Sequence, residues 1–247
     1  MGTWHWQVFF EPAPSGGGAT YLDWMLDGLR LTAMLSLSSW LIAFLWGSVM
    51  GVFRTMPNRL LYGISTIYVE VFRNVPLLVQ LMIWYFVVPE LAPTSLGDWY
   101  KSLAPLTAQF VAAMLCLGFF TGARICEQVR AGIESLSTGQ KAAGLALGFS
   151  LRQTYNHVLL PMAFRIIVPP LSSEMVNLIK NSAVASTIGL LELAAMSRQL
   201  VDYTARAYES FLAVTILYVF LNLVVLGFMR WVEQKARVPG FIGGGRG

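Results

Sequence analysis

Long apolar runs without a charged residue constrain this chain more than any other feature. Leu31–Phe53 holds no Asp, Glu, Lys or Arg, and neither do Asn74–Pro89, Ser102–Ala123 and Ser210–Met229. A helix needs about 20 apolar residues to cross the hydrocarbon core of a bilayer. Only 12% of the 247 residues are charged, against about 25% in soluble domains. The sequence therefore predicts an integral membrane protein.

The runs predict helices rather than barrel strands. They are apolar on every side instead of alternating, and a helix satisfies its own backbone in lipid. We expect an all-α integral membrane fold with about five transmembrane helices, at about 28–53, 62–89, 106–128, 163–190 and 208–231. One set of loops holds eleven Arg and Lys residues and the other holds four. The basic side is expected in the cytoplasm, which predicts a periplasmic N-terminus and a cytoplasmic C-terminus.

Prolines make two of these spans irregular. Pro76 follows Arg73-Asn74 in the second span, and Pro169-Pro170 are expected to start the fourth. For Pro76 two interpretations stay open. One is a discontinuous helix of the kind found at transport sites, and the other is a simple proline kink, which membrane helices tolerate.

Several kinds of site are not predicted. Cys116 and Cys126 fall on one predicted helix, about 15 Å apart, which is too far for a disulfide. His5 and His157 are expected on opposite sides of the membrane, so we expect no catalytic or metal site. The chain has no phosphate-binding Gly-x-x-x-x-Gly-Lys-Ser/Thr motif, so it is not expected to hydrolyse ATP itself. The basic residues form no nucleic-acid patch, and Met1–Tyr21 lacks the features of a cleavable signal peptide.

The loop between the third and fourth spans predicts a short helix at about 137–148. Ser137 or Thr138 can cap its start, and Gly148 can end it. The helix is too short to span a bilayer and consists mostly of small side chains, which let another protein approach closely. A helix lying on lipid usually carries several basic residues beside bulky ones, whereas this segment has Lys141 alone. We interpret the segment as a docking helix.

The same loop resembles the cytoplasmic signature loop of ABC importer permeases. That pattern is Glu-Ala-Ala, three residues, Gly, nine residues, Ile, any residue, Leu-Pro. This chain keeps the spacing, with Ala142 in place of the glutamate and Gly144 in place of the second alanine. Flanking matches include Gly139-Gln140 and the run Phe72–Gln80. The residues that match the coupling loop are Gly139, Gln140, Ala142, Ala143, Gly144, Gly148, Leu160 and Pro161. The chain is most similar to polar amino-acid permeases, and among them to those for glutamate and aspartate.

The resemblance implies a type I ABC importer permease in the bacterial inner membrane. It implies a periplasmic segment at 1–27, a permease domain at 28–231 with a cytoplasmic coupling loop at about 129–162, and a cytoplasmic tail at 232–247. The implied partners are an ATP-binding-cassette ATPase homodimer, a second related permease or a second copy of this chain, a periplasmic amino-acid-binding protein and membrane lipid. The chain itself would bind no cofactor, and ATP would be used by the ATPase. Alternating access would move the substrate.

Five polar residues within the spans are candidates for the translocation path: Glu70, Arg73, Asn177, Lys180 and Asn181. A charge at the centre of a bilayer costs about 2.5–3.5 kcal/mol on insertion scales. Glu70 and Arg73 can pair along one helix face, so a purely structural ion pair stays open. Lys180 can attract a substrate carboxylate, or it can reach the membrane interface or pair with the partner permease.

Two other classes of function fit the sequence less well than an importer permease. A secondary amino-acid transporter would not need the docking helix, and its usual inverted repeats are not seen. A membrane enzyme would need a clustered nucleophile or metal set. Within the importer class, glutamine or another polar amino acid stays open as the substrate.

Overall fold

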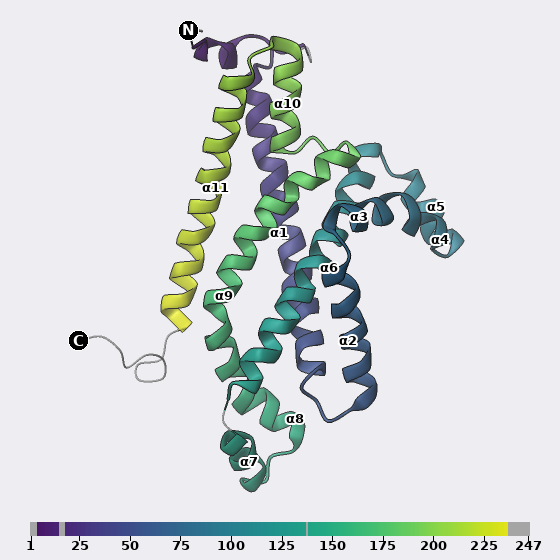
Figure 1. Cartoon of the computed structure of the whole chain (residues 1–247), viewed down its shortest axis with the longest axis vertical. Coiled ribbons are helices and arrows are strands. Elements are labelled where there is room, and N and C mark those ends of the chain that lie inside the picture. Colours follow the sequence, from purple (N-terminus) through teal and green to yellow (C-terminus); the bar gives the residue numbers. More distant parts are fainter. Residues whose placement is uncertain (1–3, 15–17, 137, 237–247) are drawn as a thin grey trace, which may run out of the picture. The chain divides into compact units, whose positions relative to one another are not determined.

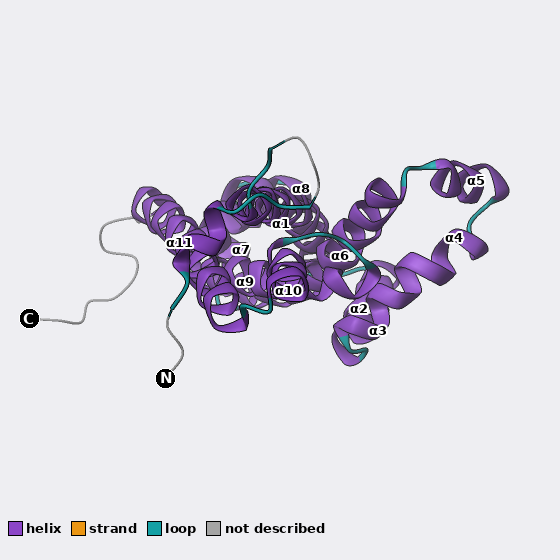
Figure 2. Cartoon of the chain, turned by 90° about the horizontal axis from the view of Figure 1, so that it is seen from above, coloured by secondary structure: helices purple, strands orange, loops and turns teal. Residues whose placement is uncertain are grey.

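The computed structural model describes residues 4–14, 18–136 and 138–236, and these residues form helices joined by short loops (Figures 1 and 2). Four helical segments are long and apolar enough to cross a membrane, and a broken pair supplies a possible fifth. The predicted all-α architecture with about five spans is confirmed. The described part contains one isolated bridge, between Pro12 and Thr20, and no strand.

The candidate spans are longer than predicted. They are α1 (Tyr21–Phe53), the broken pair that starts with α2 (Arg59–Asn74), α6 (Pro105–Glu134), the run from Leu151 to Ile188, and α11 (Ala207–Ala236). Short helices that the sequence did not predict lie outside these spans: η1 (Trp6–Phe10), α5 (Thr94–Ser102) and α10 (Leu193–Thr204).

The second span is a discontinuous helix. α2 ends at Asn74, and α3 (Leu77–Met82), the π-helical turn η2 (Ile83–Val87) and α4 (Val88–Leu91) follow after Pro76. Pro76 adopts φ −57° and ψ 139°, and proline pushes the residue before it out of the helical region. The Gln80 side chain donates from Nε2 to the Val75 carbonyl at 2.7 Å, which satisfies a backbone group that the break leaves free. Of the two interpretations of Pro76, the break is correct.

The fourth span begins earlier than expected. α8 (Leu151–Thr154), the π-helical turn η3 (Tyr155–Leu159), α9 (Leu160–Asn181) and the 3-10 segment η4 (Ser182–Ile188) follow one another without a gap. Ser150 starts α8 with a reciprocal capping box to Gln153. The prediction that Pro169-Pro170 start this span was wrong, because both lie inside α9. Proline keeps a helical φ, and membrane helices tolerate the lost N–H.

The chain divides into two compact units. The first comprises 1–41, 75–118 and 177–223, and the second comprises 42–74, 119–176 and 224–247. Two apolar clusters form the core of the first unit, one around Trp24, Met25 and Leu200, the other around Leu35, Leu81 and Leu190.

Small residues allow close helix packing in the second unit. A Cβ on Gly47 of α1 would stand 2.5 Å from the Gly122 carbonyl oxygen of α6, and one on Gly51 would stand 2.6 Å from Val129 Cβ. The buried cysteine Cys126 packs beside Met50 and Val69. The C-terminal part of α1 and the part of α6 around Gly122–Val129 therefore form a tight pair, since small residues let helix backbones approach closely in membranes.

Candidate functional site

The predicted short helix is present as α7 (Thr138–Ala146). Gly148 has φ +82°, the left-handed conformation that ends helices. The Phe149 N–H donates to the Gly144 carbonyl at 3.2 Å, and the Gly148 N–H donates to the Leu145 carbonyl at 3.0 Å. Of the two expected capping residues, Ser137 lies outside the described residues. The prediction of a short helix closed by Gly148 is confirmed.

One face of α7 is uncovered within the described chain. Ala142 and Ala143 are exposed, as are Leu145 and, just after the helix, Leu147, which is 75% accessible. Two of these positions, Ala142 and Ala143, are among the residues that match the signature loop. Leucines exposed to this degree on a helix of nine residues form an apolar surface of the kind that marks interaction sites.

The opposite face of α7 packs on α8 and η3 (Figure 1). Gly144 is buried there, and a Cβ on it would stand 2.8 Å from Thr154 Cγ2 and 3.1 Å from Thr154 Oγ1. The glycine is therefore required by the close approach of α8. This contact accounts for Gly144 at a position where the signature loop has alanine.

The end of the signature loop is helical rather than irregular. Leu160 and Pro161 are the first two residues of α9, so the predicted loop at 129–162 corresponds to the end of α6, then α7, α8 and η3. Pro161 comes just after the π-helical turn η3, so its missing N–H falls where the regular pattern of helix hydrogen bonds is already interrupted.

A cavity of about 420 Å³ in the second unit is the candidate solute site. Side chains of α2, α6 and α9 line it: Arg73, Phe120, Arg124, Glu127, Gln128 and Glu174. Polar and charged groups inside a membrane-spanning bundle are expensive and usually mark a substrate pathway. The cavity therefore combines two guanidinium groups with two carboxylates in a bundle that is otherwise apolar.

Glu174 and its neighbours leave acceptor capacity unused. Gln128 Nε2 donates to Glu174 Oε1 at 3.2 Å, and Arg124 Nη1 lies 3.7 Å from Glu174 Oε2. Glu174 Oε2 and Gln128 Oε1 are both buried and accept no hydrogen bond from the described residues. Buried acceptors without a donor are costly, so two oxygen atoms at this wall of the cavity are suited to a donor that the chain itself does not supply.

The negative charge of Glu127, which also lines the cavity, is compensated by ion pairs within the chain. The carboxylate pairs with Arg54, from the turn after α1, and its Oε2 accepts from Arg130 Nη2 at 3.0 Å. Arg130 in turn pairs with Glu134 at 3.0 Å. This network of ion pairs joins the turn after α1 to α6. It also leaves the positive charge of Arg73 uncompensated among the described ion pairs.

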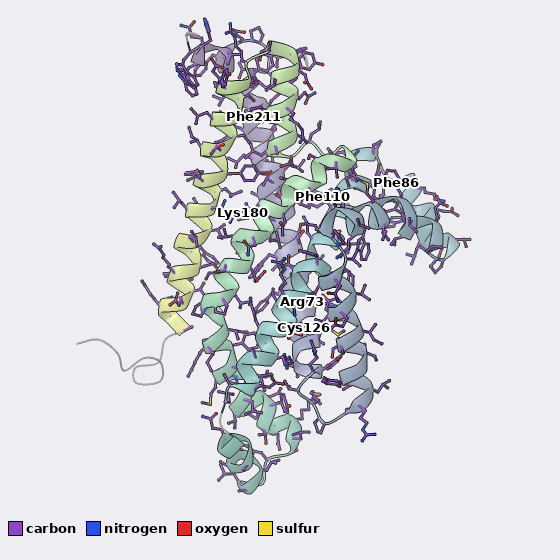
Figure 3. All side chains as sticks on the ribbon, viewed as in Figure 1. Arg73, Phe86, Phe110, Cys126, Lys180 and Phe211 are labelled. Atoms are coloured by element: carbon purple, nitrogen blue, oxygen red, sulfur yellow. The ribbon has the colours of Figure 1, made fainter. Side chains whose placement is uncertain are left out.

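The ion pair between Glu70 and Arg73, which the sequence left open, is not formed in the described part of the chain. Glu70 Oε2 accepts instead from Asn74 Nδ2, one turn further along α2, at 2.8 Å. Within the described residues no ion pair joins Glu70 to Arg73. The Arg73 side chain lies at the end of α2 (Figure 3) and lines the cavity.

The other three candidate residues of the translocation path lie at the end of α9, in the first unit. Asn177 and Asn181 are half-buried, and Lys180 is exposed (Figure 3). These three residues belong to the first unit, whereas Glu70 and Arg73 belong to the second. The predicted set of five residues is therefore divided between the units.

Sequence reasoning missed the role of Arg124, Gln128 and Glu174 in this cavity. Arg124 was counted among the basic residues of the loops, although it falls within the predicted third span at about 106–128. α6 in fact continues to Glu134, so Arg124 lies well inside the helix. The signal was the spacing of Arg124, Glu127 and Gln128 over three and four residues, which places all three on one helix face.

Comparisons with known proteins agree with this architecture. The profile of the family described as "Binding-protein-dependent transport system inner membrane component" matches residues 43–238. The chain is 54% identical over 242 residues to the glutamate/aspartate import permease protein GltJ of Escherichia coli (strain K12), covering 98% of each chain. It is 29% identical to the glutamine transport system permease protein GlnP of the same strain, covering 87% of this chain and 93% of the relative.

Solved structures show the same fold. A chain of an amino acid ABC transporter crystallised with histidines superposes with a TM-score of 0.71, at 25% identity and over 87% of this chain. A chain of the inward-facing MetNI methionine ABC transporter superposes with the same TM-score at 21% identity. The predicted permease fold and the resemblance that led to it are confirmed.

Proposed function

This chain belongs to the family of binding-protein-dependent transport system inner membrane components, and we propose that it carries glutamate or aspartate across the membrane. It is the permease type of subunit in an ABC importer, located in the inner membrane. The observation that carries the choice of substrate is the cavity itself, whose lining includes two arginines and two buried acceptor oxygens without a donor among the described residues.

The chemistry of the cavity matches an acidic amino acid group by group. Arg73 and Arg124 offer planar guanidinium groups, which bind carboxylates with two parallel hydrogen bonds. Glu174 Oε2 and Gln128 Oε1 offer acceptors for an α-ammonium group. A substrate with two carboxylates and one ammonium carries a net charge of −1, which compensates the unpaired Arg73.

The relatives support the same choice. GltJ, named for glutamate and aspartate, shares 54% of its residues with this chain, whereas GlnP, named for glutamine, shares 29%. Glutamine carries no net charge, so it would leave the positive charge of Arg73 uncompensated. Glutamine transport is therefore the second candidate, favoured only by the wider family.

The energy for transport comes, in this proposal, from a separate ATPase. The exposed apolar face of α7 supports docking of a homodimeric ATP-binding cassette at this helix. A second related permease, or a second copy of this chain, would complete the pathway, and a periplasmic amino-acid-binding protein would deliver the substrate. Closure of the ATPase would move α7 and switch the spans between inward-open and outward-open states.

Asn177, Lys180 and Asn181 form a second polar part of the pathway in this proposal. Lys180 is exposed at the end of α9, and the two asparagines flank it. A cation there would raise the local concentration of an acidic substrate.

Uptake by the reconstituted importer tests the substrate. We expect ATP-dependent uptake of labelled glutamate, competed by aspartate and far less by glutamine. Arg73→Met should lower glutamate uptake by about tenfold or more, because a hydrogen bond to a charged group contributes about 1.5–3 kcal/mol. Arg59→Met is the matched control, since Arg59 is an exposed arginine at the other end of α2.

The outcome separates the two candidates. Uptake of glutamine in preference to glutamate, or an Arg73→Met variant that transports glutamate as well as the Arg59→Met variant does, contradicts the proposed role of the cavity. Uptake that follows an ion gradient without ATP contradicts the importer mechanism as a whole.

A further inference from the structure

A buried tyrosine links the segment beyond the docking helix to the turn between α1 and α2. Tyr155 is the first residue of η3 and is 3% exposed. Its hydroxyl donates to the Thr55 carbonyl oxygen at 2.7 Å and lies 3.2 Å from Thr55 Oγ1. The two residues are 100 positions apart in the chain. The bond therefore joins elements that the sequence does not connect locally.

The contact between α7 and α8 makes the near side of this link rigid. Thr154, the residue before Tyr155, is fully buried and packs on Gly144 with no room for a methyl group. Its hydroxyl donates to the Ser150 carbonyl at 3.1 Å. Tightly packed elements move together rather than deform. A displacement of α7 is thus passed to Thr154 and to Tyr155.

Thr55, the acceptor of this hydrogen bond, is connected in turn to the candidate cavity. Thr55 follows Arg54, whose side chain is only 10% exposed and pairs with Glu127. Glu127 lines the cavity beside Arg124 and Gln128. The sequence of contacts is therefore α7, Thr154, Tyr155, Thr55, Arg54 and Glu127, all within the second unit.

We propose that the Tyr155 hydroxyl is a positioning group that transmits motion of α7 to the α1–α2 turn and, through Arg54, to the wall of the cavity. The inference rests on the proposed function, because it needs α7 to be moved by a partner. It adds a route through the turn after α1, by way of Thr55 and Arg54. Tyr155 itself touches neither the substrate nor the ATPase in this proposal.

Tyr155→Phe tests the inference, since it removes one hydroxyl and leaves the ring packing intact. The complete importer is reconstituted with its ATPase and binding protein, and two rates are measured: ATP hydrolysis and substrate uptake. We expect uptake per ATP hydrolysed, and the stimulation of hydrolysis by the loaded binding protein, to fall about fivefold, the effect of losing one net hydrogen bond. Unstimulated hydrolysis should stay at the wild-type rate.

Tyr68→Phe is the matched control. Tyr68 also donates its hydroxyl to a backbone carbonyl of another helix, that of Phe119, at 2.6 Å, but it has no contact with α7. Both variants should lower the thermal unfolding midpoint to a similar extent. If the Tyr155 hydroxyl only stabilised the fold, the two variants would also have equal uptake per ATP hydrolysed.

A double variant checks that the contacts act in series. Arg54→Met should lower uptake per ATP, and adding Tyr155→Phe to it should lower the ratio much less than Tyr155→Phe does alone, because residues in one chain of contacts are not additive. Independent, multiplicative losses contradict the inference. A Tyr155→Phe importer with wild-type uptake per ATP also overturns it, whereas failure of ATP-driven uptake in the wild type would refute the proposed function instead.

Discussion

Tyr218 on α11 donates its hydroxyl to the buried carboxylate of Glu192 at 2.8 Å. Glu192 is 0% exposed and caps α10 as well, accepting from the N–H groups of Ala194 and Ala195 at 3.0 and 2.9 Å. Burial raises the pKa of Glu192, and the donors Ala194 and Tyr218 offset part of the rise. One carboxylate thus fixes α10 against α11 within the first unit.

Glu192→Gln should destabilise the folded chain by about 1–2 kcal/mol. The glutamine amide turns one acceptor into a donor, which then faces either a backbone N–H or the Tyr218 hydroxyl. The thermal unfolding midpoint in detergent or nanodiscs measures this loss. Glu90→Gln is the control, because Glu90 is exposed and forms only a surface pair with Lys101.

The stability difference between the wild type and Glu192→Gln, measured at several pH values, tests the direction of the pKa shift of Glu192. The pKa of Glu192 is raised in the folded state above its ordinary value of 4.5. Its contribution to stability is therefore fully present below about pH 4.5 and is lost as the pH rises through the folded pKa. We expect the stability advantage of wild type over Glu192→Gln to shrink as the pH rises from 4.5. An advantage that grows with pH contradicts the assigned direction of the pKa shift.

Gly144→Ala should separate α7 from α8. A Cβ at this position would stand 2.8 Å from Thr154 Cγ2, and a buried β-branched side chain has little freedom to move away. Overpacking of this kind costs about 1–3 kcal/mol. We expect reduced uptake per ATP hydrolysed in the reconstituted importer.

The control for this prediction is Gly63→Ala. Gly63 lies in α2 with no atom within 4 Å of an added Cβ, so alanine should be tolerated and should favour the helix by up to about 1 kcal/mol. If Gly144→Ala transports as well as Gly63→Ala, the contact between α7 and α8 is not needed for transport.

Most of the fold was predictable because the bilayer imposes a simple rule on the sequence. Charge-free runs marked the spans, and the sequence Gly139–Gly148 marked α7. Helix ends were less accurate: α6 and α11 extend beyond their predicted ends, where polar residues continue the helix after the apolar run stops. Pro169-Pro170 looked like a start signal, but in a packed membrane helix they lie within α9.

The candidate site was only partly predictable. Arg73 was expected in the pathway and lines the cavity, whereas its expected partner Glu70 bonds to Asn74. Local spacing cannot decide between two partners on the same helix face. Arg124 and Glu174 come together from α6 and α9, and Thr55 and Tyr155 meet across 100 residues. Such pairings depend on how the helices pack, which the sequence pattern does not specify.

Lys180→Ala tests the second polar part of the proposed pathway. Loss of an exposed cation should raise the KM for glutamate about two- to threefold through weaker electrostatic attraction, with a smaller effect at high ionic strength. Lys180→Arg keeps the charge and should preserve the wild-type KM. A Lys180→Ala importer of unchanged subunit composition, with normal glutamate uptake at low substrate concentration, rules out this role for Lys180.

Transport in this scheme depends on the docking of α7 on a nucleotide-hydrolysing partner, and cysteine crosslinking at the exposed face of α7 probes that contact. Ala142→Cys introduces an accessible thiol, while Cys116 and Cys126 are buried; Thr215→Cys, on the exposed surface of α11, is the control. We expect Ala142→Cys to crosslink to the ATPase in assembled membranes with a yield that nucleotide changes, and we expect no crosslink from Thr215→Cys. If an assembled, transporting complex gives no more ATPase crosslink from position 142 than from position 215, α7 is not the docking helix.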